Sequence, residues 1–112
     1  MTTNNHEVIF AIVNAGFAEE AMAVAREQGA RGGTILHARG VAKEKEAAFF
    51  GITIHADKEI LMLVVEKGSR NGILNALYQS MGMDKQSQGI IFSLPVSDVA
   101  GLATPPSAEN QE

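Results

Sequence analysis

The chain contains no cysteine and no tryptophan among its 112 residues. The absence of thiols excludes disulfide bonds and thiolate metal sites, which is compatible with a reducing compartment. The longest strongly apolar run, residues 60–65, is too short to cross a bilayer, so we expect no membrane insertion. The first residues, MTTNNHE, lack the basic and apolar segments of a secretory signal. These absences together favour a cytoplasmic protein.

Positive charge is also scarce in this sequence. Nine lysines and arginines face 13 acidic residues, and the net charge of −4 argues against binding to nucleic acid. The histidines at 6, 37 and 55 lack the mutual spacing of metal ligands, so no metal site is predicted. No nucleophile–base pair or paired carboxylates stand out, so we expect no catalytic residues and no enzyme activity.

Apolar periodicity predicts six elements in the order strand, helix, strand, strand, helix, strand. This order is that of the ferredoxin-like βαββαβ sandwich, an α+β fold with a four-stranded antiparallel sheet. We expect one domain over residues 1–102, with a loop at about 40–51. The Pro-rich, polar tail 103–112 has too little apolar surface to fold and is predicted to be disordered. The predicted strands are 8–13, 34–39, 52–65 with a possible bend at 55–58, and 90–96; the helices are 17–28 and 70–81.

Capping residues bracket both predicted helices. Asn14 or Gly16 could cap the start of the first, and Gly29 follows its end as a left-handed cap would. Ser69 is the expected N-cap of the second helix, and Gly82 is expected to end it.

The strands are apolar on both of their faces. Residues 8, 10 and 12 are as apolar as residues 9, 11 and 13, and the same holds along 60–65. Two helices in such a fold cover one face of the sheet, and a face open to water should alternate with polar residues. Because these strands do not alternate, we expect the second face to contact another subunit.

The segment GARGGTILHARG, residues 29–40, combines four glycines with two arginines. Such a segment either cradles phosphate or lets a helix stop and a strand begin. Gly29 is explained as a helix cap, whereas Gly32 and Gly33 lie at the mouth of a strand, where glycine indicates close approach to the backbone. The segment is not a Walker loop, because it lacks GK[ST] and precedes a strand.

Several segments in this order resemble the P-II signalling proteins of nitrogen regulation. They are GARGGT, the loop after it, EILMLVVEKGS at 59–69 and GIIFSLPV at 89–96, and the resemblance covers residues 7 to 97. It implies a ferredoxin-like homotrimer that binds an adenine nucleotide in the clefts between subunits. It also implies that the protein regulates a transporter or metabolic enzyme through its loop.

The resemblance also implies which residues contact the nucleotide. The glycines at the mouth of the second strand would admit the adenosine, and the third strand would contact the base. The segment before the last strand would approach the phosphates, and two residues would form the base of the loop. The implied site residues are Gly32, Gly33, Thr34, Arg39, Gly40, Val64, Ser87, Gln88 and Gly89.

The chain departs from the family pattern at its phosphate cations. Ile90 stands where the family has lysine, and Gly101 and Ala103 stand where it has arginines. Each charge-assisted contact contributes roughly 1.5–3 kcal/mol, so AMP or ADP is expected to bind about as well as ATP. Arg39 and Lys85 are the candidates to compensate.

Other family features are also missing. The single tyrosine, Tyr78, lies in the second predicted helix, so the loop lacks the tyrosine that the family modifies. The glutamine that helps the family to hold magnesium and 2-oxoglutarate has no match, although Lys58 occupies the position of the family's loop-end lysine.

Two functional interpretations follow from these observations. The favoured one is a regulator that is not an enzyme, whose loop at 40–51 changes order when a nucleotide binds. The alternative is a ferredoxin-like trimer that binds another small molecule or a metal, or serves as a structural partner without nucleotide sensing. Fold analogy does not separate them.

Overall fold

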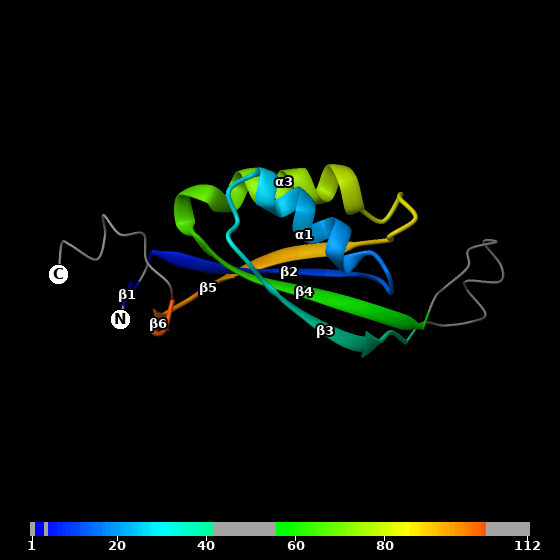
Figure 1. Cartoon of the computed structure of the whole chain (residues 1–112), viewed down its shortest axis with the longest axis horizontal. Helices are drawn as coiled ribbons and strands as arrows, with labels where there is room; N and C mark the ends of the chain where they lie inside the picture. Colours follow the sequence, from blue (N-terminus) through cyan, green and yellow to red (C-terminus); the bar gives the residue numbers. More distant parts are fainter. Residues whose placement is uncertain (1, 4, 42–55, 103–112) are drawn as a thin grey trace.

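A computed structural model describes residues 2–3, 5–41 and 56–102. The main sheet is antiparallel throughout, with the strand order β3–β4–β2–β5, and two helices pack against it (Figure 1). The predicted α+β ferredoxin-like fold is confirmed. Its strands are β2 (His6–Asn14), β3 (Thr34–Arg39), β4 (Asp57–Glu66) and β5 (Ile90–Pro95), and its helices are α1 (Ala18–Glu27) and α3 (Arg70–Met81).

The structure differs from the prediction at several element ends. Asp57 and Lys58, predicted to lie in a bend, belong to β4 because they pair with Arg39 and Ala38. A small second sheet joins β1 (Thr2–Thr3) to β6 (Asp98–Val99), and segments this short carry no periodic signal. The loop tip, the predicted strand segment 52–55 and the tail 103–112 lie outside the described residues.

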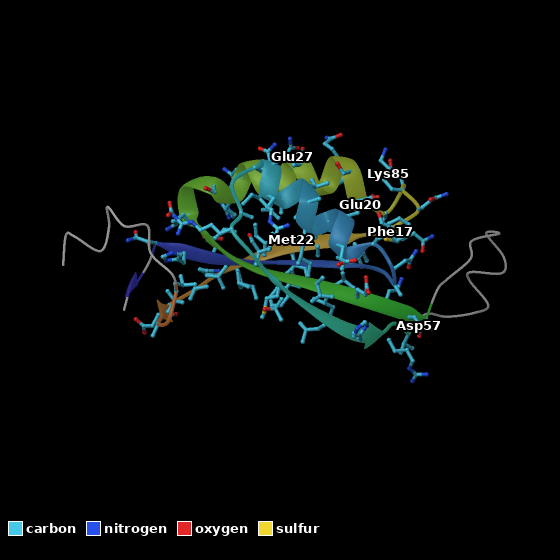
Figure 2. All side chains as sticks on the ribbon, viewed as in Figure 1. Phe17, Glu20, Met22, Glu27, Asp57 and Lys85 are labelled. Atoms are coloured by element: carbon cyan, nitrogen blue, oxygen red, sulfur yellow. The ribbon has the colours of Figure 1, made fainter. Side chains whose placement is uncertain are left out.

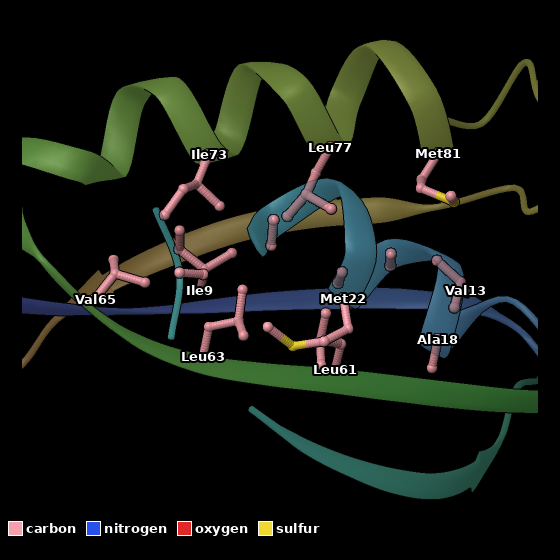
Figure 3. Close-up of a cluster of buried hydrophobic side chains, with 14 residues drawn as sticks. Ile9, Val13, Ala18, Met22, Leu61, Leu63, Val65, Ile73, Leu77 and Met81 are labelled. Carbon is pink, nitrogen blue, oxygen red and sulfur yellow. The ribbon is translucent and has the colours of Figure 1, made fainter. Parts of the chain in front are cut away.

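The core lies between the helices and one face of the sheet, which we call the helix face (Figure 3). Alternate residues of β2 and β4 point into it, with Ile9 opposite Leu63 and Ala11 opposite Leu61. Small alanines on α1 let that helix approach the sheet closely. The buried helix residues are Ala18, Ala21, Met22 and Ala25 on α1, and Ile73, Leu77 and Met81 on α3.

The opposite face of the sheet, which we call the open face, is apolar and is covered by neither helix (Figure 1). Ile90 is 54% exposed and Leu94 50% exposed on this face. The rings of Phe10 and Phe92 stack across β2 and β5 with centroids 5.2 Å apart. The register places these apolar residues on the open face: Val8, Phe10, Ile12, Leu36, Ile60, Met62, Val64, Ile90, Phe92 and Leu94.

The start of α1 is capped from a distant strand rather than by its own flanking residues. The Glu59 carboxylate on β4 accepts hydrogen bonds from the N–H groups of Gly16 (2.9 Å) and Ala18 (3.0 Å). A negative charge at a helix N-terminus is favourable because the first N–H groups lack helical partners. Phe17 occupies the N-cap of α1, so the predicted cap by Asn14 or Gly16 is wrong.

The other predicted helix ends are confirmed in position. Gly29 has φ +104°, and the N–H groups of Gly29 and Ala30 bond to the carbonyls of Arg26 and Ala25, which is a Schellman motif. Ser69 occupies the N-cap of α3, but its hydroxyl makes no capping bond, because a 3₁₀ turn (Lys67–Ser69) leads into the helix. Neither α1 nor α3, nor any other helix in the described ranges, has the length and apolar character that a membrane crossing needs.

We expect Glu59→Ala to lower the free energy of unfolding by about 1–2 kcal/mol, because both N–H groups at the start of α1 lose their acceptor. Urea denaturation at one protein concentration measures this difference. Glu66→Ala, which removes a carboxylate from the other end of β4, serves as the control. Equal losses in the two variants would contradict the capping role.

Candidate functional site

The residues implied to bind a nucleotide fall into two groups at opposite ends of β4. Thr34 pairs with Met62, so Gly32, Gly33 and Thr34 lie near Val64. Arg39 pairs with Asp57 at the start of the same strand, close to the turn that contains Ser87. With a rise of about 3.3 Å per residue, the two groups lie roughly 15–20 Å apart in one chain.

The first group combines bare backbone with exposed apolar surface. A Cβ on Gly33 would lie 2.5 Å from Leu63 Cδ2 and 3.0 Å from the Met62 carbonyl oxygen, so glycine lets the chain cross β4 closely. A Cβ on Gly32 would have nothing within 4 Å. Thr34 is exposed, and Val64 is partly exposed on the open face. Gly33 thus has a structural reason to be glycine, whereas the backbone at Gly32 is accessible.

The second group is a turn that is tied to the end of α3. The Ser87 hydroxyl donates to the Met81 carbonyl (3.0 Å), and the Gly89 N–H donates to the same oxygen (2.7 Å). A Cβ on Gly89 would collide with that oxygen, and Gln88 adopts the left-handed conformation at φ +48°. The buried hydroxyl of Ser87 therefore holds the turn in place.

A buried asparagine, which the sequence analysis treated only as a helix cap, joins this turn to the sheet. The Asn14 amide group donates to the Gln86 carbonyl (2.8 Å) and to Gln88 Oε1 (3.3 Å). Its Oδ1 accepts a hydrogen bond from Lys58 Nζ (2.7 Å), and its backbone N–H donates to the Ser87 carbonyl (2.8 Å). We call Asn14, Lys58 and residues 86–88 the sheet-end cluster.

Gly40 shapes the approach to the sheet-end cluster. A Cβ on Gly40 would lie 3.0 Å from Lys58 Cε, so the lysine stem runs along the bare backbone of Gly40. The Gly40 N–H donates to the Ala56 carbonyl (2.6 Å), which places Ala56 beside the first residue of the predicted loop. The alternation of β3 places Arg39 on the opposite, helix face of the sheet from Lys58.

Charged side chains of both signs lie near this end of the sheet. Figure 2 shows Lys85 on the turn after α3 and Asp57 at the start of β4, both toward the same end of the sheet. Lys85 is exposed, whereas Lys58 is half-buried. Among the described residues, no group of three His, Asp or Glu side chains is arranged to hold a metal ion.

We expect Gly89→Ala to lower the free energy of unfolding by about 2–3 kcal/mol, because the new methyl group overlaps the Met81 carbonyl oxygen. Gly32→Ala, whose methyl group meets open space, should change it by less than about 0.5 kcal/mol. Urea denaturation of both variants at one protein concentration measures the difference. An unaffected Gly89→Ala variant would show that the turn can move aside without cost.

Comparisons with known proteins agree with this fold. The Nitrogen regulatory protein P-II family model matches residues 6–104, and no curated protein matches the chain. The chain is similar to Arabidopsis thaliana PII in a crystal structure with bound citrate, with 24% identity and a TM-score of 0.66. That match covers 88% of this chain and 82% of the other.

Two further solved structures are similar at lower identity. A PII-like signaling protein from Thermus thermophilus is 17% identical with a TM-score of 0.63, over 84% of this chain and 88% of the other. A functionally unknown protein from Pediococcus pentosaceus is 15% identical with a TM-score of 0.61, over 88% and 99%. At these identities the structures show the fold alone. The family match spans most of the sequence, so the chain belongs to the P-II family of nitrogen regulatory proteins.

Proposed function

We propose that the chain forms a homotrimer that binds an adenine nucleotide in the clefts between subunits and thereby regulates a transporter or a metabolic enzyme. Membership of the P-II family supports a signalling role, since proteins of this family are regulators rather than enzymes. The proposed site consists of the residues implied by the sequence, with Asn14 and Lys58 added from the geometry of the sheet-end cluster.

One observation carries this proposal: the two groups of site residues lie at opposite ends of a sheet whose open face is apolar. Within one chain, the first group and the sheet-end cluster are too far apart to form a single compact pocket. A second subunit that packs on the open face would bring its own residues 32–34 and Val64 toward the sheet-end cluster of the first subunit. Burial of open-face side chains such as Phe92 and Leu94 favours this packing, at up to roughly 1.5–3 kcal/mol each.

The proposed effector is AMP, ADP or ATP, with little discrimination by phosphate number. Ile90 opens β5 directly after the turn and presents an apolar side chain where the family has lysine. Asn14 holds Lys58 against the turn through hydrogen bonds, and Lys85, which directly precedes residues 86–88, is exposed. One positioned cation stabilises the first phosphates more than a longer chain, because Coulomb attraction falls with distance.

The proposed output is the loop at about 40–51, most of which lies outside the described residues. Its described base is close to the sheet-end cluster: Gly40 bonds to Ala56, and Arg39 pairs with Asp57. Lys58 follows Asp57 directly, and its side chain runs along Gly40, so an anion bound to the Lys58 ammonium would lie close to the residue where the loop begins. Binding could in this way shift the population of loop conformations that engage a partner.

The alternative is a trimer that binds another small molecule. The Arabidopsis PII structure with citrate supports a small carboxylate as this second candidate. A carboxylate would use the same Lys58 ammonium and the same turn. Competition between citrate and nucleotide separates the two cases, because citrate should displace a nucleotide only if they share the cluster.

We expect calorimetry on the wild-type chain to give dissociation constants for AMP, ADP and ATP within about tenfold of one another. The physical reason is the apolar residue at position 90 in place of a cation. A hundredfold preference for ATP, equal to about 2.7 kcal/mol, would contradict this expectation. Binding of citrate with no binding of any nucleotide would favour the alternative function.

We expect light scattering to give three times the chain mass at micromolar concentration. Phe92→Lys should dissociate the trimer, because it places a charge in the buried interface and removes the stacking on Phe10. Tyr78→Lys is the matched control, since Tyr78 is 64% exposed on α3, on the other side of the sheet. A wild-type monomer would rule out both the trimer and the shared site.

A further inference from the structure

We propose that Asn14 is a positioning residue that holds the Lys58 ammonium against the 86–88 turn and so determines how strongly this site binds phosphate groups. The inference rests on the proposed function and extends it, because it assigns the anion-binding strength to a residue that the sequence pattern did not suggest. The hydrogen bonds, burial and register of the sheet-end cluster carry it.

The Asn14 side chain uses each of its polar groups inside the cluster. An asparagine amide carries two N–H donors and one carbonyl acceptor. The donors go to the Gln86 carbonyl and Gln88 Oε1, and the acceptor takes the Lys58 ammonium. Because Asn14 is only 4% exposed, losing any of these partners would leave a polar group poorly hydrated. The arrangement therefore fixes Lys58 relative to the turn.

Lys58 keeps donor capacity for a ligand after it bonds to Asn14. An ammonium has three N–H donors, and the 2.7 Å bond to Asn14 Oδ1 uses one of them. The aliphatic stem of Lys58 lies along Gly40. In the sheet, Lys58 pairs with Asn14 of β2 on one side and with Ala38 of β3 on the other. A lysine held in this way loses little further rotamer freedom when a phosphate binds, and such preorganisation raises affinity.

The cluster compensates for the apolar residue that follows the turn. Ile90 supplies no charge, and the Ser87 hydroxyl already donates to the end of α3. Lys58 approaches the turn from β4 instead, through Asn14. Without Asn14 the Lys58 side chain would be free to sample other rotamers over Gly40, and its contribution to anion binding would fall.

A double-mutant cycle on the full-length chain tests this inference. Asn14→Leu removes the three side-chain hydrogen bonds at similar volume, and Lys58→Met removes the charge at similar length. We expect calorimetry to show that each single substitution weakens the binding of ADP about tenfold and the binding of AMP about threefold, because the positioned charge acts on phosphate. The double variant should be within about twofold of Lys58→Met, because both changes remove one contact. Asn75→Leu, at an exposed position of α3, is the control.

Two results in this cycle would overturn the inference. Losses that multiply to about a hundredfold for ADP would mean that Asn14 and Lys58 act independently. Equal losses for AMP and ADP in Asn14→Leu would indicate a purely structural role, because a damaged fold does not distinguish phosphate number. If Asn14→Leu fails to fold, Asn14→Ala replaces it, since it removes the same three side-chain hydrogen bonds with a smaller side chain.

A ligand-free measurement distinguishes failure of this inference from failure of the proposed function. Lys58→Met should shift the backbone amide resonances of residues 87–89 in the NMR spectrum of the wild-type background. The same change should leave these resonances in place when Asn14 is leucine or alanine, because the connection through the amide group is gone. Shifts of equal size in both backgrounds would overturn the positioning role. Absence of nucleotide binding to the wild type would instead overturn the proposed function.

Discussion

The structure depends on one constraint: a four-stranded sheet that is apolar on both faces carries helices on only one of them. Side chains alternate along a strand, so burying Ile9 and Leu63 under the helices necessarily points Phe10 and Met62 the other way. The helix face forms a closed core, whereas the open face leaves large side chains such as Ile90 half exposed. An exposed apolar surface of this kind supports the proposed packing of a second subunit against it.

The polar end of the sheet is linked to this open face by the same alternation. Asn14 and Lys58 continue the open-face side of β2 and β4 at the point where β2 ends and β4 begins. Backbone and side-chain groups there need partners, which the turn before β5 supplies through Gln86, Ser87 and Gln88. The proposed subunit contact and the proposed ligand site would therefore lie next to each other, since the apolar surface leads directly into the polar cluster.

Local patterns predicted the elements well and their long-range contacts poorly. The helical period of residues 70–81 predicted α3 with the bounds that the structure shows, and Gly29 marked the end of α1, where it adopts a positive φ. The cap of α1 was missed because Glu59 lies some forty residues away in the chain. The sequence predicted a possible bend at Asp57 and Lys58 because polar residues interrupt the apolar run there. Pairing with β3 instead keeps both residues extended.

The sequence by itself determined the order of the elements, the apolar character of both faces of the strands and the glycine that ends α1. Periodicity and backbone freedom are local properties, so they can be recognised in the sequence. Only the tertiary structure decided what several of those residues do. Gly33 and Gly89 are required by close contact with other segments, and Asn14 links Lys58 to a turn more than seventy residues away. These contacts depend on strand register and helix packing, which bring together residues whose spacing in the chain carries no signal.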